Sequence, residues 1–265
     1  MKKTINCDVI IPTYRNIDTI NRAVDSVLNQ TVLPNKIIII DDHSNDTEYL
    51  KVLRELESLE IVNVLYLNKN GGPGTARNKG IEISNAKYIA FLDSDDAWHL
   101  NKLEIQYQVM ENKNYYLTAH NTIYKNNNII ERISESYISK NVSPKKLLFK
   151  NIIATRSVML KNDKTYFFKE NKRFSEDYLM WLEIAFDKKK IGYINENLAF
   201  HFYNNFSSGL SSNHKKMLLG EIENFKILAE RKKIARITQY LASLFSILKY
   251  LKRLVKVLLF SKGHN

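Results

Sequence analysis

The pattern of hydrophobic and polar positions divides the first hundred residues into alternating strands and helices. Four apolar runs have the length and composition of buried strands: residues 8–11, 36–40, 61–67 and 87–92. Apolar side chains at helical spacing follow the first three runs, from near Asp18, from about Thr47 and over residues 75–84. Strands that alternate with helices are typical of a parallel sheet with helices on both faces. We therefore predict an α/β fold with a single central, mostly parallel sheet.

The second half of the chain has a less regular pattern. It predicts helices at residues 99–110, 144–149, 175–186 and 211–229. It predicts strands within residues 115–140, with a turn at 126–128, and at residues 152–160, 166–168 and 191–203.

The turns after the predicted strands are polar. Right-handed crossovers place all strand-to-helix turns of such a sheet at one edge, and ligands bind there, beyond the carboxyl ends of the strands. Four polar segments should therefore meet: residues 12–16, 41–46, 71–78 and 93–96.

Three carboxylates stand close together in the last of these segments, at Asp93, Asp95 and Asp96. Carboxylates crowded at the end of a buried strand repel one another, and a divalent cation removes that cost. Mg²⁺ and Mn²⁺ prefer oxygen ligands and complete their shells with water and phosphates. The segment therefore suggests an enzyme that handles a metal-bound diphosphate. A polar turn that caps the next helix is the alternative.

The motifs of two common nucleotide-binding folds are absent: there is no Gly-x-x-x-x-Gly-Lys-Ser/Thr, and no Gly-x-Gly-x-x-Gly follows the first strand. Five other motifs occur in order. They are Val-Ile-Ile-Pro-Thr-Tyr (residues 9–14), Ile-Ile-Asp-Asp-His-Ser-Asn-Asp (39–46), Gly-Thr-Ala-Arg-Asn (74–78), Phe-Leu-Asp-Ser-Asp-Asp (91–96) and Glu-Asp-Tyr-Leu-Met-Trp-Leu (176–182). Over residues 7–187 this set closely resembles the inverting glycosyltransferases of family 2, which have the GT-A fold.

The resemblance implies a domain organisation. Residues 1–210 would form the GT-A domain, with a nucleotide-sugar half at 1–100 and an acceptor half at 101–210. Residues 211–265 would add C-terminal helices that end in a basic amphipathic tail.

The resemblance also implies roles in binding a UDP-sugar donor. Asp42 would accept a hydrogen bond from the uracil N–H; its alternative is an acid at the start of a helix. Arg77 would lie near the base and diphosphate, or be a surface arginine. Asp96 and Asp95 would hold Mn²⁺ or Mg²⁺. The residues expected to touch the nucleotide-sugar are Pro12, Thr13, Tyr14, Asp42, Arg77, Asp93, Ser94 and Asp95.

Asp177 is the residue that the resemblance implies as catalytic base. It would take the proton from the acceptor hydroxyl, because inversion needs a base opposite the leaving group. The alternative is an acid that caps the helix after Ser175. Glu176 would position the acceptor or the loop, and Trp98 would line the donor sugar or pack in the core. His201 would help the metal or the diphosphate, or be a structural histidine at a strand end.

Basic residues are concentrated at the C-terminus. The formal net charge is +12, and nine basic residues and no acidic ones follow Glu230. In residues 236–260 a stripe of apolar side chains recurs at helical spacing: Ile237, Leu241, Leu244, Leu248, Leu251, Val255 and Leu258. Such a helix suits an anionic membrane surface; the alternative is packing on the body or on a second subunit.

Together these features predict transfer of glucose, galactose or an N-acetyl form from UDP to a saccharide acceptor, possibly linked to undecaprenyl diphosphate, in O-antigen or capsule synthesis. The segment before the first strand is too short for a signal peptide, so we expect a cytoplasmic enzyme, peripheral at the inner face of the membrane. Cys7 is the sole cysteine, which excludes an internal disulfide.

The alternatives are a metal-dependent nucleotidyltransferase, a nucleic-acid binder and a scaffold without catalysis. A nucleotidyltransferase should have a glycine-rich basic loop after the first strand, and residues 12–14 are not one. Nucleic-acid binding is not expected, because the basic charge lies in the tail and the body has no known binding module. The intact carboxylates disfavour a scaffold.

Overall fold

The computed structural model describes residues 2–124, 138–202 and 212–261. The elements in chain order are β1 (Thr4–Thr13), α1 (Ile20–Leu28), β2 (Leu33–Asp41), α2 (Thr47–Glu57), β3 (Val62–Tyr66), α3 (Pro73–Ile83), β4 (Tyr88–Phe91), β5 (Asp96–Trp98), α4 (Lys102–Lys113), β6 (Leu117–Tyr124), β7 (Ser139–Asn141), α5 (Pro144–Phe149), the 3₁₀ turn η1 (Thr155–Ser157), β8 (Met159–Lys161), α6 (Glu176–Phe186), β9 (Ile191–His201), α7 (His214–Glu230) and α8 (Arg236–Ser261).

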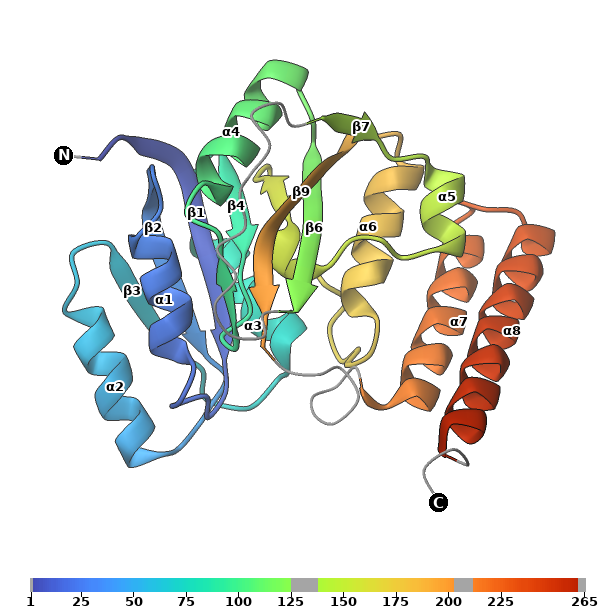
Figure 1. The fold of residues 1–265 in the computed structure, drawn as a ribbon, viewed down its shortest axis with the longest axis horizontal. Coiled ribbons are helices and arrows are strands. Elements are labelled where there is room, and N and C mark those ends of the chain that lie inside the picture. The colour runs from blue at the N-terminus through green and yellow to red at the C-terminus, as the bar shows by residue number, and fades with distance from the viewer. Residues whose placement is uncertain (1, 125–137, 203–211, 262–265) are drawn as a thin grey trace.

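One central sheet organises the molecule (Figure 1). Its strand order is β3-β2-β1-β4-β8-β6-β9-β5, and β7 pairs with β9. The first four strands pair in parallel, as predicted. In the second half only β6 and β9 are parallel, and the pairings of β8, β5 and β7 are antiparallel. The α/β class is confirmed, with a sheet that is parallel in its first half and mixed in its second.

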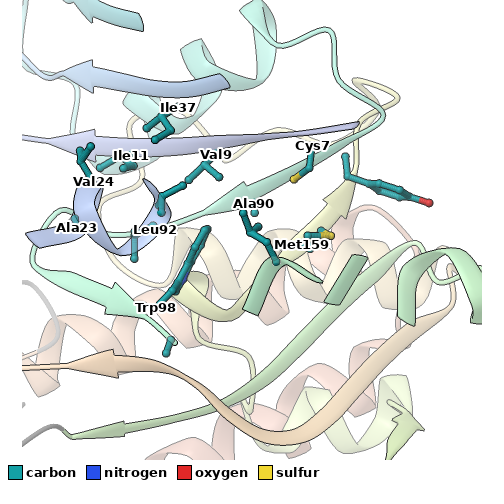
Figure 2. Close-up of a cluster of buried hydrophobic side chains, with 14 of the residues drawn as sticks. Cys7, Val9, Ile11, Ala23, Val24, Ile37, Ala90, Leu92, Trp98 and Met159 are labelled. Atoms are coloured by element: carbon teal, nitrogen blue, oxygen red, sulfur yellow. The ribbon is translucent and has the colours of Figure 1, made fainter. Parts of the chain in front are cut away.

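Two apolar cores cover the two faces of the sheet. Successive residues of a strand point to opposite faces, so Val9 and Ile11 face one core and Ile10 faces the other. The first core contains residues of α1, α2 and α4. Figure 2 shows part of it, where Val9 and Ile11 of β1 lie near Ala23 and Val24 of α1. The second contains residues of α3, α5, α6, α7 and α8.

Close packing against β1 constrains helix α3. A Cβ at Gly80 would stand 2.5 Å from a methyl carbon of Ile10. The helix can therefore lie directly on the strand only with glycine at this position. This contact fixes the axis of α3, whose first turns carry Arg77 to the edge of the sheet.

The prediction of a strand at residues 166–168 is wrong. Asn78 in α3 binds both backbone groups of Phe168: its amide nitrogen donates to the Phe168 carbonyl at 2.8 Å, and its amide oxygen accepts from the Phe168 N–H at 2.8 Å. A side chain thus takes the place of a neighbouring strand. The predicted strand at residues 152–160 is also shorter, because η1 interrupts it before β8.

Helices α7 and α8 pack along the α5–α6 side of the body. The predicted boundary at residue 210 falls within residues 203–211, outside the described residues, as do the turn at 126–128 and the last residue of the strand predicted at 191–203, which ends at His201. Within the described residues, no helix is both long and apolar enough to cross a bilayer.

Candidate active site

A cavity of about 960 Å³ opens at the carboxyl ends of β1, β2 and β4. All of the predicted site residues except Trp98 line it: Pro12, Thr13, Tyr14, Asp42, Arg77, Asp93, Ser94, Asp95, Asp96, Glu176, Asp177 and His201. The size suits a nucleotide-sized ligand. The four polar segments that follow the first strands therefore contribute to one cavity, as the handedness of the crossovers predicted.

Asp42 is 4% exposed and holds the turn that precedes α3. Its two carboxylate oxygens accept from the N–H groups of Gly71 at 2.8 Å and Gly72 at 2.7 Å. Gly72 has φ +83°, a conformation that favours glycine. Burial raises the pKa of Asp42, and the two glycine N–H groups oppose that shift. The alternative role as a helix cap does not apply, because Asp46 caps α2 by accepting from the Tyr49 N–H.

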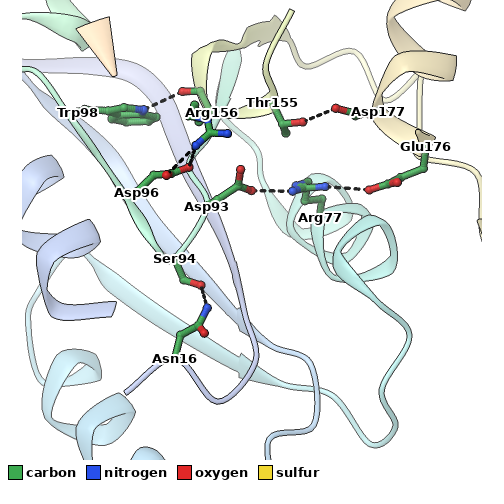
Figure 3. A network of polar contacts seen from close by, with 10 residues as sticks. All are labelled: Asn16, Arg77, Asp93, Ser94, Asp96, Trp98, Thr155, Arg156, Glu176 and Asp177. Carbon is green, nitrogen blue, oxygen red and sulfur yellow. Dashed lines mark hydrogen bonds and ion pairs between the residues drawn. The ribbon is translucent and has the colours of Figure 1, made fainter. Parts of the chain in front are cut away.

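Arg77 joins the acidic turn after β4 to the start of α6 (Figure 3). Its guanidinium donates to Asp93 at 2.6 Å and to Glu176 at 3.4 Å. The side chain is 7% exposed, so Arg77 is not a surface arginine. Burial alone would lower the pKa of Arg77, but the two carboxylates raise it. The pKa of Asp93 is lowered: burial opposes the shift and Arg77 causes it.

Asp96 makes an ion pair that the sequence did not predict. One nitrogen of Arg156, Nη1, lies 2.7 Å from each carboxylate oxygen of Asp96. Burial nevertheless raises the pKa of Asp96 well above its usual value, and Arg156 opposes that shift. Burial also raises the pKa of Asp95, with Asp93 adding to the effect. Burial is thus the main reason that the pKa values of these two carboxylates are raised, and the charge of neighbouring carboxylates adds to it.

The carboxylates on the cavity wall are chemically suited to bind a hard divalent cation. Six carboxylates and three guanidinium groups are among the described residues on the cavity wall, and carboxylate oxygens are ligands that Mg²⁺ and Mn²⁺ prefer. The described residues contain no group of three or more acidic, histidine or cysteine side chains placed to hold an ion. Protein ligands would thus supply only part of a metal shell, as is usual where phosphates complete it.

Asp177 lies on the wall at the start of α6, with Arg77 and Asp93 nearby (Figure 3). One of its oxygens accepts from the Thr155 hydroxyl at 2.9 Å, and the other accepts from the Tyr178 N–H at 2.7 Å. Burial raises the pKa of Asp177, and burial together with Asp177 raises the pKa of Glu176 to about 7. A carboxylate with a raised pKa is a better base near neutral pH.

Helix α7 supports the turn that presents Asp177. Ser175 has φ 56°, and its carbonyl accepts from the Asn224 amide at 2.8 Å. A Cβ at Gly220 would stand 2.5 Å from the Phe174 carbonyl oxygen. Because α7 lies this close, the C-terminal region helps to build the cavity.

Trp98 does not line the cavity. It is 4% exposed and packs in the first core, and its indole N–H donates to the Arg156 carbonyl at 2.8 Å (Figures 2 and 3). The core alternative for Trp98 is therefore the observed one. His201 is the register partner of Asp96 across β5 and β9, which places it on the wall beside the acidic turn.

Several residues on the wall were not predicted: Asn16, Thr155, Arg156 and Arg173. Thr155 and Arg156 belong to η1, within a segment that the apolar pattern assigned to a strand. Asn16 donates to the Ser94 hydroxyl at 2.5 Å and so links the first and fourth polar segments. The one available signal was the charge of Arg156 within an otherwise apolar run.

Comparison with known proteins gives consistent results. The profile of Glycosyl transferase family 2 matches residues 8–164, more than half of the chain. A Rickettsia bellii protein described as an uncharacterized glycosyltransferase is 33% identical over 76% of this chain and 31% of its own length. The chain thus spans about a third of that relative.

An Escherichia coli protein named UDP-Glc:alpha-D-GlcNAc-diphosphoundecaprenol beta-1,3-glucosyltransferase is 32% identical over 79% of this chain and 81% of its own length. The crystal structure of Staphylococcus aureus TarS (residues 1–349) in complex with UDP-GlcNAc superimposes with a TM-score of 0.65 at 18% identity, over 87% of this chain and 71% of that one. This superposition confirms the GT-A fold expected from the motifs. By its profile match and by its relatives, the chain belongs to glycosyltransferase family 2.

Proposed function

We propose that this protein is an inverting glycosyltransferase that transfers a sugar from a UDP-sugar to a saccharide acceptor. The observation that carries the proposal is the position of Asp177. This carboxylate, with its raised pKa, shares one cavity with a buried arginine and an acidic turn suited to a metal-bound diphosphate.

The wall of the cavity offers a place for the nucleoside. Tyr14 is 42% exposed at the rim, so its ring is available to pack on a pyrimidine. Asp42 already accepts two N–H groups, and a carboxylate has room for about four. It can therefore accept the uracil N–H as well. The TarS complex with UDP-GlcNAc and the UDP-glucose named for the E. coli relative support a uridine donor.

Asp95 and Asp96 would hold Mn²⁺ or Mg²⁺ together with the donor phosphates. Bound there, the ion supplies positive charge where the leaving diphosphate gains negative charge. Arg77 stands across the same turn, anchored by Asp93, and adds a second positive charge on the chain itself.

The transfer step uses Asp177 as base. The acceptor oxygen forms a bond to the anomeric carbon while the bond from that carbon to the phosphate oxygen breaks. The acceptor proton passes to a carboxylate oxygen of Asp177, and UDP leaves with the bonding electrons. Thr155 and the Tyr178 N–H hold the carboxylate during this step. An α-linked donor gives a β-linked product.

The acceptor is proposed to be a lipid-linked saccharide met at an anionic membrane, in synthesis of a surface polysaccharide such as O-antigen or capsule. The diphosphoundecaprenol in the name of the E. coli relative supports this. So does α8, whose predicted stripe faces outward. Its side chains are 48–65% exposed at Ile237, Leu241, Leu244, Leu248, Leu251 and Val255.

A panel of UDP-sugars with Mn²⁺ or Mg²⁺, scored by UDP release, tests the proposed function. We expect release to rise when a saccharide acceptor is added, and Asp177→Asn to lower kcat by about 10²–10⁴-fold. Asp25→Asn, the same change on an exposed face of α1, is the matched control. Release of pyrophosphate from UTP and a sugar 1-phosphate, with no UDP released from any UDP-sugar, would identify a nucleotidyltransferase and refute the proposal.

A further inference from the structure

Arg156 is held in the cavity by its main chain and by its side chain. The Trp98 indole N–H donates to the Arg156 carbonyl, and the Arg156 guanidinium forms an ion pair with Asp96. Asp96 is 2% exposed, so it has little water to compensate its charge. Arg156 is therefore the counter-ion of the most buried carboxylate in the acidic turn.

Arg156 contacts Asp96 through one nitrogen and not through two parallel N–H donors of its guanidinium. Nη1 makes both short contacts, and Nε is buried without a hydrogen-bond partner among the described residues. Arginine binds carboxylate or phosphate best through two parallel N–H donors. The ion pair with Asp96 thus leaves binding capacity of Arg156 unused within a cavity that is rich in carboxylates.

A divalent ion bound through both oxygens of Asp96 would stand close to the Arg156 nitrogen that now contacts the same two oxygens, and the two cations would repel one another at that distance. Loading Asp96 with metal in this way therefore favours release of Arg156. A diphosphate in the same cavity is the partner that suits a displaced guanidinium.

We propose that Arg156 is an exchangeable counter-ion: it occupies Asp96 in the free enzyme and moves to the donor diphosphate when metal and nucleotide bind. This inference rests on the proposed function, because it takes a nucleoside diphosphate as the ligand. Its consequence is coupled binding. Metal alone must displace Arg156 without offering it a new partner, whereas UDP provides one, so each ligand strengthens binding of the other by the same factor.

Titration of Mn²⁺ by calorimetry, and by the electron paramagnetic resonance of free Mn²⁺, tests the exchange without turnover. In the unsubstituted protein we expect UDP to tighten Mn²⁺ binding about tenfold or more. In Arg156→Gln, Mn²⁺ should bind the nucleotide-free protein about tenfold more tightly, and the further gain from UDP should shrink. Arg156→Lys, which keeps the charge, should bind Mn²⁺ without UDP as weakly as the unsubstituted protein does.

Arg173→Gln is the matched control, since Arg173 lies on the same wall but donates to Asn70. It should leave Mn²⁺ binding without UDP unchanged. Equal Mn²⁺ affinity in the nucleotide-free Arg156→Gln and unsubstituted proteins, or no binding of Mn²⁺ in either, overturns the exchange. If the protein transfers sugar but Arg156 does not affect Mn²⁺ binding, the proposed function stands and the exchange is wrong. If the exchange is observed but no donor supports transfer, the exchange stands and the proposed function is wrong.

Discussion

Lys102 is a single residue that lowers the free energy of unfolding, because its amine is buried. Its side chain is fully buried, with the ammonium 3.6 Å from the centre of the Trp98 ring and without a hydrogen-bond partner among the described residues. Burial lowers its pKa to about 7. In the unfolded chain the pKa returns to about 10.4. Between these values the unfolded state binds more protons, so stability rises with pH across that window.

We expect Lys102→Met to raise the free energy of unfolding by about 1–3 kcal/mol at pH 7, because an apolar side chain of similar length removes the buried amine. The gain should shrink as the pH rises from 7 toward 10, because the cost of removing the lysine proton on folding falls as the pH approaches the pKa of the unfolded chain. Denaturant unfolding at several pH values measures both effects. Lys69→Met, at an exposed position, is the control. A gain independent of pH would mean that Lys102 is charged in neither state or in both.

At the residue scale the sequence predicted half of the residues that line the cavity. The carboxylates of residues 42 and 93–96 come after apolar runs, whereas Arg77, Glu176 and Asp177 were indicated by the motifs alone. The sequence pattern missed Arg156 and Thr155 for a physical reason. Their turn is defined by contacts with Asp96 and Trp98 of β5 and with Asp177 of α6, which are distant in the sequence. Local pattern carries no information about such partners.

At the scale of elements, α7 acts as a support for the start of α6. Asn224 is fully buried, and its amide holds the Ser175 carbonyl in the turn before Asp177. The sequence predicted α7 from its spacing, but nothing in that spacing shows what the helix packs against. The strand predicted at residues 166–168 failed for a similar reason, since a distant asparagine takes up the backbone groups of Phe168.

Asn224→Leu should lower kcat by about tenfold or more with little change in KM for the donor, because a loosened turn misplaces the base. It should also cost about 1–3 kcal/mol of stability, since the Ser175 carbonyl is left unpaired. Steady-state kinetics and thermal unfolding measure the two effects. Asn213→Ala removes the N-cap of α7 without touching Ser175 and should affect stability alone. An unchanged kcat in a folded Asn224→Leu protein would show that α7 only stabilises the domain.

At the scale of the whole molecule, α8 has two unlike faces. Ala242 and Ser246 point inward, and Phe245 contacts Phe149 of α5 at 5.5 Å between ring centres. The outward face carries the apolar stripe together with Lys252 and Arg253, whereas Lys249 pairs with Glu221 of α7. Spacing predicted the stripe correctly. It could not decide which side of the helix the body would cover, because that depends on the small residues at the contact.

Changing Leu244 and Leu248, which are 54% and 55% exposed, to serine should weaken binding to liposomes with anionic lipid by about tenfold or more. Added salt should weaken it further, because the lysines contribute about 1 kcal/mol each. Liposome co-sedimentation measures this, and neutral liposomes serve as the reference surface. Unchanged binding would remove the membrane assignment, and a dimer that dissociates in the double variant would indicate a second subunit instead.

The short turn η1 contacts two residues with different proposed roles. Thr155 donates to Asp177, the proposed base, and Arg156, the next residue, contacts Asp96, a proposed metal ligand. The two contacts are one peptide unit apart, so a rearrangement of this turn on donor binding would reach the hydroxyl that holds Asp177. Such a linkage would couple loading of the donor to placement of the proposed base.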